Sequence, residues 1–218
     1  MNKEKMHLFY GGPFSQWYRC KFVENGIVYN GTEQYMMAKK AHFFGDTESY
    51  DLIMSMKEPW DQKAQGKKVR NFVKEHWENY CRPMVREGNK LKFSQNPELK
   101  QYLLSTGDME IVEASPTDTI WGIGLAENDP RAYDKSQWRG TNWLGIAIME
   151  VRDEFKRDIV RYNCYNKKDL SLTFTNEEAE VLKGFVDNFF KHNKESNSSY
   201  SEDYALMKNI KDQMSGGK

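Results

Sequence analysis

Glu33 and Lys40 stand seven residues apart in a segment whose pattern is typical of a helix. Thr32 is expected to cap this helix, because its hydroxyl can bind a free amide of the first turn. Seven residues make about two turns, so both side chains should point to one side, with Met36 and Met37 between them. A carboxylate and an amine would then face a common space across apolar methionine side chains. The alternative is a solvated helix face, on which Glu near the start and Lys further along suit the helix dipole.

Asp118 is a second candidate, because it follows a turn at Pro116 and precedes Trp121 and the glycine pair Gly122 and Gly124. A carboxylate held against an indole ring and bare backbone is typical of a sugar or nucleobase site. The alternative is an Asp that binds the backbone of its own turn. The glycine spacing matches neither a dinucleotide-binding loop nor a P-loop.

Asn142 is a further polar residue that stands beside aromatic and glycine residues without an evident packing reason. Trp77 stands at helical spacing from Phe72, Val73 and Tyr80, and from spacing alone it is better interpreted as a core residue. No Ser/His/Asp or Cys/His arrangement follows from the spacings.

The elements that must position these residues are mostly helices. Asn25-Gly26, between the apolar runs 19–23 and 27–29, predicts a β-hairpin directly before the first helix. Apolar patterns predict two more short strands, at 7–10 and 111–114. Helical patterns cover 47–56, 60–68, 70–82, 99–104 and 144–155. Asp46 should cap the first of these helices, and Pro83 should end or kink the helix over 70–82. The sequence therefore predicts a predominantly helical α+β fold with a small N-terminal sheet.

The chain changes character after residue 157. Residues 158–218 carry two more helical patterns, at 175–190 and 202–214. We therefore expect a single domain of residues 1–157 and a helical C-terminal extension of residues 158–218. The apolar residues expected to pack the extension on the domain are Leu182, Phe185, Val186 and Phe189.

Composition excludes several classes of protein. The 218 residues include 32 basic and 32 acidic side chains, so any contact with nucleic acid would need a local patch. The three Cys and four His lack metal-site spacing, so we expect no metal and no cofactor. No signal-like or membrane-spanning apolar run is visible, and we expect a cytoplasmic protein with reduced thiols and no membrane contact.

The segment from Glu33 to Lys40, EQYMMAKK, resembles the E-H-Y-F-Q-A-x-K motif of the YbiA-like (NADAR) family. Further family motifs follow in the same order, and the resemblance covers about residues 9–155. They are Gly66-Lys67, Trp77, Lys92-Phe93, Leu104-Ser105-Thr106-Gly107, Glu113-Ala114-Ser115-Pro116-Thr117-Asp118, Trp121-Gly122-Ile123-Gly124, Trp138-Arg139-Gly140-Thr141-Asn142-Trp143-Leu144-Gly145 and Met149-Glu150-Val151-Arg152. The departures are Gln34 for His, Met36-Met37 for Phe-Gln and Lys67 for Arg.

The resemblance implies an N-glycosidase of the ADP-ribosylglycohydrolase type, which removes ADP-ribose from guanine bases of DNA or RNA. It implies that Lys40 is a covalent nucleophile that forms a Schiff base with the ring-opened ribose. Glu33 and Asp118 would share proton transfer and ribose binding. The expected substrate-binding residues are Trp77, Trp121, Asn142, Lys67, Tyr35 and Gly122.

Two alternatives remain at this point. The first is a hydrolase of phosphorylated ribosylamino-pyrimidine intermediates of riboflavin biosynthesis, for which a fused reductase or deaminase domain would be an indicator. The second is a binding module that holds ADP-ribose or NAD without turnover. The presence of Glu33, Lys40 and Asp118 together argues against the binding module, because binding alone does not require a buried amine.

Overall fold

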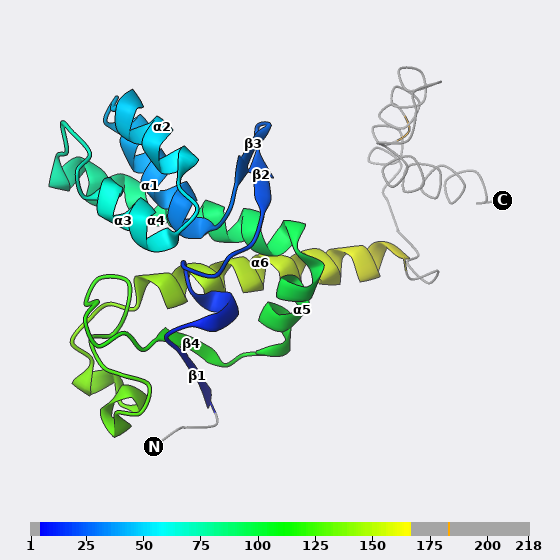
Figure 1. Cartoon of the computed structure of the whole chain (residues 1–218). Helices are drawn as coiled ribbons and strands as arrows, with labels where there is room; N and C mark the ends of the chain where they lie inside the picture. Colours follow the sequence, from blue (N-terminus) through cyan, green and yellow to red (C-terminus); the bar gives the residue numbers. More distant parts are fainter. Residues whose placement is uncertain (1–4, 167–182, 184–218) are drawn as a thin grey trace. The chain divides into compact units, whose positions relative to one another are not determined.

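The computed structural model describes residues 5–166 and residue 183, which contain six α-helices and four short strands (Figure 1). The α-helices are α1 (Thr32–Phe43), α2 (Thr47–Ser55), α3 (Pro59–Gly66), α4 (Lys74–Gln95), α5 (Pro97–Ser105) and α6 (Trp143–Asn166). The strands are β1 (Met6–Phe9), β2 (Phe22–Glu24), β3 (Ile27–Tyr29) and β4 (Glu110–Glu113). Short 3-10 helices are η2 (Gly12–Phe14), η3 (Pro130–Tyr133) and η4 (Lys135–Gln137). The predicted α+β fold, with helices dominant, is confirmed.

Residues 1–157 form one unit by their mutual contacts, and residues 158–218 form a second. The predicted helices over 175–190 and 202–214 lie outside the described residues, apart from residue 183. The predicted packing of Leu182, Phe185, Val186 and Phe189 on the domain also lies outside them.

The predicted β-hairpin is confirmed, although β2 covers only part of the expected strand. β2 and β3 pair antiparallel, with Phe22 opposite Tyr29. Asn25 and Gly26 have φ angles of 50° and 81°, the left-handed values that a two-residue type I′ turn requires. The rings of Phe22 and Tyr29 are buried and stack with centroids 5.7 Å apart. The hairpin is thereby anchored in the core directly before α1.

β1 and β4 form a separate parallel pair, which runs from Met6 opposite Glu110 to Phe9 opposite Glu113. Parallel neighbours need a long crossover connection, and here α1 to α5 supply it. The described residues therefore contain two two-stranded sheets instead of one small N-terminal sheet. The pairing places the end of β4, and with it Glu113, beside the turn after Phe9.

The start of α1 differs from the prediction, because Thr32 is the first helical residue and does not cap the helix. Gly31 occupies the cap position without a side-chain hydrogen bond. The carbonyl of Gln16 accepts hydrogen bonds from the Thr32 hydroxyl at 3.2 Å and from the Glu33 amide at 3.1 Å. A distant loop therefore satisfies the donors that a local cap would satisfy.

α4 also differs from the prediction, because it starts at Lys74 and passes through Pro83 to Gln95. A proline in a helix interior removes one hydrogen bond and usually kinks or breaks the helix. Here the turns that follow Pro83 bury Met84, Val85 and Phe93, and this apolar burial offsets the lost bond.

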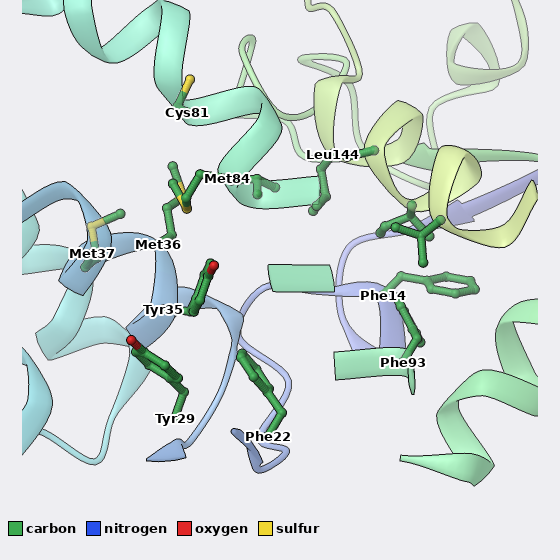
Figure 2. Close-up of a cluster of buried hydrophobic side chains, with 14 of the residues drawn as sticks. Phe14, Phe22, Tyr29, Tyr35, Met36, Met37, Cys81, Met84, Phe93 and Leu144 are labelled. Atoms are coloured by element: carbon green, nitrogen blue, oxygen red, sulfur yellow. The ribbon is translucent and has the colours of Figure 1, made fainter. Parts of the chain in front are cut away.

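The core gathers around α1, which contacts α2, α3 and α4. Every residue from Thr32 to Ala38 is buried, and so is Ala41. Figure 2 shows side chains of this core from several elements. They are Phe14, Phe22, Tyr29, Tyr35, Met36, Met37, Cys81, Met84, Phe93 and Leu144. A helix that is buried on nearly all sides belongs to the centre of a domain.

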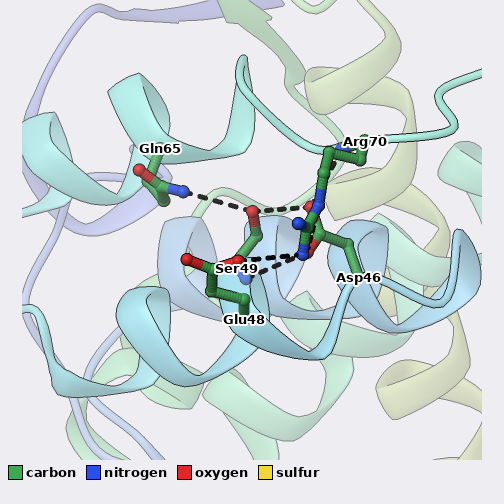
Figure 3. A network of polar contacts seen from close by, with 5 residues as sticks. All are labelled: Asp46, Glu48, Ser49, Gln65 and Arg70. Carbon is green, nitrogen blue, oxygen red and sulfur yellow. Dashed lines mark hydrogen bonds and ion pairs between the residues drawn. The ribbon is translucent and has the colours of Figure 1, made fainter.

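A polar network joins the start of α2 to α3 and to the segment after α3 (Figure 3). Asp46 caps α2 as predicted, and its Oδ1 accepts a hydrogen bond from the Ser49 amide at 3.2 Å. Arg70 donates to the same carboxylate from its backbone amide at 2.9 Å and from its guanidinium at 2.6 Å. These Arg70 bonds hold the pKa of the Asp46 carboxyl well below its usual range.

The contact between α6 and β4 generates a first prediction, because it leaves no room for a side chain at Gly145. A Cβ there would lie 2.1 Å from the Ile111 carbonyl oxygen and 2.5 Å from Asn142 Oδ1. Gly145→Ala should therefore destabilise the protein by about 1–3 kcal/mol in urea denaturation, as overpacking does. Gly11→Ala is the matched control, since a Cβ at Gly11 meets nothing within 4 Å. Equal unfolding free energies for the two variants would contradict this packing.

Candidate active site

A cavity of about 1220 Å³ collects six of the nine predicted site residues. These residues are Glu33, Lys40, Lys67, Trp77, Asp118 and Trp121. They come from α1, from the segment after α3, from α4 and from the loop after β4. Residues 10–19, between β1 and the hairpin, contribute much of the remaining wall.

Lys40 presents its amine to the cavity between aromatic rings. Its Nζ lies 4.2 Å from the centroid of the Phe72 ring and 5.8 Å from that of Trp77. The amine donates a hydrogen bond to the Gly66 carbonyl at 2.9 Å, and no carboxylate pairs with it among the described residues. Burial lowers the pKa of this amine.

Glu33 is buried in the first turn of α1, with a relative exposure of 4%. The pKa of its carboxyl is raised to about 7, chiefly by burial and to a smaller extent by the nearby charge of Asp118. Lys63 and a hydrogen bond from the Trp17 side chain act in the opposite direction. The exposure of 4% excludes the solvated helix face considered from the sequence. A pKa near 7 suits a group that gains or loses a proton near neutral pH.

Asp118 stabilises its own turn and also lines the cavity. Its Oδ1 accepts backbone hydrogen bonds from Ile120 at 2.9 Å and from Trp121 at 2.7 Å, as an Asp that stabilises its own turn would do. The residue also lines the cavity. The turn thus orients a carboxylate toward the space that Glu33 and Lys40 face.

Tyr35, Asn142 and Gly122 do not line the cavity, and direct substrate contacts do not fit their positions. The Tyr35 hydroxyl donates to Glu24 at 2.8 Å, and its ring is buried in the core. Asn142 has a φ of 53° and is buried; its Nδ2 donates to the Ile111 carbonyl at 3.0 Å. A Cβ at Gly122 would lie 2.9 Å from a backbone oxygen of β4. These three residues therefore contribute to the packing of the fold and not to the lining of the cavity.

Glu113, Lys63 and Trp17 line the cavity but are not among the residues predicted from the sequence. Lys63 Nζ lies 5.5 Å from the centroid of the Trp17 ring. The pKa of Glu113 is raised to about 8, chiefly by burial and next by the charge of Asp118. The available sequence signal for Glu113 was an acidic residue that ends an apolar strand within the Glu113-Ala114-Ser115-Pro116 motif.

The outer part of the cavity is basic and aromatic. Trp60 is 68% exposed and contacts the ring of Trp17 edge to face, with centroids 6.3 Å apart. Lys63, Lys67 and Lys68 line this part of the cavity, and none of them forms an ion pair within the described part of the chain. Unpaired lysines beside exposed indole rings are suited to bind phosphates and to stack bases.

Within residues 5–166 and residue 183, no group of His, Cys, Asp and Glu side chains has an arrangement that could hold a metal ion. In the same residues, no helix combines the length and apolar character needed to cross a membrane.

Comparison with known proteins identifies the family. The model of the NADAR domain matches residues 6–156. N-glycosidase R617 of Acanthamoeba polyphaga mimivirus is 45% identical over 146 residues, which are 65% of this chain and 86% of the relative. N-glycosidase Npun_R5314 of Nostoc punctiforme is 30% identical over 146 residues, which are 64% of this chain and 86% of the relative.

A solved structure supports the same fold. The NMR structure of the E. coli protein YbiA aligns with a TM-score of 0.60 at 24% identity, over 72% of this chain and 88% of that chain. The resemblance predicted from the sequence motifs is confirmed, and the chain belongs to the NADAR domain family.

Proposed function

We propose that this protein is an N-glycosidase that cleaves the bond between a ribose and the nitrogen of a base or amine. The observation that carries the proposal is the half-buried amine of Lys40, which faces the same cavity as the carboxyl groups of Glu33 and Asp118. The relatives from the mimivirus and from Nostoc punctiforme are named N-glycosidases, which supports the same class of reaction.

The proposed reaction uses Lys40 as a covalent nucleophile. Cleavage of a glycosidic bond passes through a state with positive charge on the anomeric carbon and the ring oxygen. The lone pair of Lys40 Nζ bonds to the anomeric carbon as the bond to the base breaks, and the base leaves with that electron pair and gains a proton. Ring opening then forms an imine between Lys40 and the sugar. Water hydrolyses the imine, which releases the sugar aldehyde and restores the amine.

Glu33 and Asp118 share proton transfer and ribose binding in this proposal. A general acid or base works best with a pKa near the working pH, and Glu33 has a pKa of about 7. Asp118 is held by two backbone amides through Oδ1, which suits a carboxylate that binds a ribose hydroxyl or faces the developing positive charge.

The finer proposal is that the substrate is ADP-ribose attached to a guanine base of nucleic acid. The cavity of about 1220 Å³ is larger than the roughly 300–1,000 Å³ typical of small-molecule sites. Trp17 and Trp60 offer ring surfaces for a second base, and Lys67 and Lys68 offer charges for two phosphates. A ribosylamino-pyrimidine with a single ring and a single phosphate would leave much of this outer part unused.

Borohydride trapping tests Lys40 directly. With an oligonucleotide that carries ADP-ribosylated guanine, reduction should leave a covalent sugar adduct on Lys40, detected by mass spectrometry. Lys40→Arg should abolish both the adduct and cleavage, because a guanidinium stays protonated and cannot attack. Lys39→Arg is the matched control, since Lys39 lies next to Lys40 on α1 but pairs with Glu24 at 2.5 Å.

Cleavage by Lys40→Arg at the wild-type rate would contradict the covalent route and favour direct attack by water. A parallel assay with phosphorylated ribosylamino-pyrimidine distinguishes the two substrate classes. Turnover of that compound alone would contradict the ADP-ribose proposal but keep the N-glycosidase.

Glu33→Gln should separate activity from stability. Loss of a proton-transfer group should slow cleavage on the order of 10²-fold. The folded-state pKa of about 7 lies above the unfolded value, so the wild type loses stability as pH rises through 7. The neutral Gln avoids this loss, and at pH 8.5 the variant should be more stable by on the order of 1–3 kcal/mol, with a smaller difference at pH 5.

Urea denaturation at pH 5 and pH 8.5 measures this effect. Glu75→Gln, which changes an exposed carboxylate in the first turn of α4, is the control and should show no such pH-dependent gain. A Glu33→Gln protein less stable than wild type at pH 8.5 would contradict the assignment of a costly buried carboxyl.

A further inference from the structure

Glu113 is held in place by its backbone at the end of β4. Its amide donates to Asn142 Oδ1 at 2.9 Å, and its carbonyl accepts a hydrogen bond from the Ile123 amide at 2.9 Å. On the other side, β4 pairs with β1, and Glu113 lies opposite Phe9. With both backbone groups bound, the position from which the side chain enters the cavity is determined.

The carboxyl of Glu113 lacks the partners that a buried polar group normally has. Its Oε2 is buried and makes no hydrogen bond among the described residues. A buried oxygen without a partner costs folding free energy, so its presence in a cavity wall calls for an explanation. A ligand in the cavity would supply the missing partner.

Burial, and after it the nearby charges, raise the pKa of Glu113. Asp118, on the loop that follows β4, and Glu33, on α1, face it with like charge, and Lys63 on α3 acts in the opposite direction. Burial has the largest effect, and together these influences raise the pKa of Glu113 to about 8. At neutral pH the group is therefore a carboxylic acid with an O–H to donate.

We propose that Glu113 is a third catalytic carboxyl and the proton donor to the leaving base. This role rests on the proposed N-glycosidase function. As the glycosidic bond breaks, its electron pair passes to the base nitrogen, and the Glu113 proton moves to the base while Glu113 becomes a carboxylate. The water that hydrolyses the imine later returns a proton to Glu113, so the cycle closes without another reactant.

The three carboxyls then have different tasks. Two backbone amides bind Asp118, an arrangement that orients a hydrogen-bond acceptor. Glu33 has a pKa of about 7, which suits a group that takes up and returns a proton near neutral pH. Glu113 combines an unpaired oxygen with a pKa above neutrality, which is the combination that a proton donor requires.

The test measures the pH dependence of kcat and KM with an oligonucleotide that carries ADP-ribosylated guanine. Because a general acid must be protonated, the wild-type kcat should fall as pH rises through about 8. Glu113→Gln should lower kcat on the order of 10²-fold at pH 7, leave KM largely unchanged and remove this alkaline fall. Glu113→Asp, which retains a carboxyl, should recover part of the rate and keep an alkaline fall.

The control comes from the same strand. Glu110→Gln removes a carboxylate that pairs with Lys135 at 2.6 Å and does not line the cavity, so its pH profile should match the wild type. An alkaline fall that persists in Glu113→Gln, or a wild-type kcat in that variant, would overturn the role of Glu113.

Failure of the underlying function gives a different result. If the wild type cleaves neither the oligonucleotide nor phosphorylated ribosylamino-pyrimidine, the N-glycosidase proposal fails and the donor role falls with it. Carbon-13 NMR of labelled glutamate checks the donor without turnover. A carboxyl that titrates near pH 8 and is missing in Glu113→Gln supports the protonated acid, and no such carboxyl in the wild type overturns it.

Discussion

The constraint on which the rest of the structure depends is the burial of α1 on almost every side. The helix is packed by α2, α3 and α4, and its residues from Thr32 to Ala38 are shielded from water. An acidic residue in such a turn loses its hydration, which is why the pKa of Glu33 rises. Two turns later the helix emerges far enough for Lys40 to reach the same cavity with its chain half covered. A single buried helix therefore presents an acid and an amine to one space, and both have shifted pKa values.

The gathering of Glu33, Glu113 and Asp118 in one cavity lowers the stability of the fold when these groups are ionised. Burial and like charge both raise the free energy of the ionised carboxylates. The surrounding backbone compensates for this. Asn142 adopts a left-handed φ of 53° and uses its amide to bind both ends of the Ile111 to Glu113 segment. Such a local conflict, held in place by its surroundings, is more typical of a functional site than of a site that only supports the fold.

Local chemistry made much of the fold predictable from the sequence, and long-range contacts account for what was missed. The Asn25-Gly26 turn and the Asp46 cap depend on neighbouring residues, and both are present as expected. Thr32 was expected to cap α1, but the cap is replaced by the carbonyl of Gln16 from another part of the chain. Asn142 was expected to contact substrate, but its side chain instead bonds to backbone groups of β4, about thirty residues away. Glu113 could not be assigned because its environment arises only in the folded chain, where Glu33 of α1 and Lys63 of α3 act on its carboxyl.

The environment of Lys40 also depends on a network that lies outside the cavity. Phe72, whose ring lies closest to the amine, belongs to the irregular segment between α3 and α4. That segment has no regular hydrogen-bond ladder of its own, and Arg70 attaches it to Asp46 through one backbone and two guanidinium hydrogen bonds. Charge-assisted hydrogen bonds of this kind are directional, so they determine the position of the segment more closely than apolar packing alone would. The cap of α2 thus also places the ring beside the amine, and the surroundings of Lys40 depend on the same carboxylate that starts the next helix.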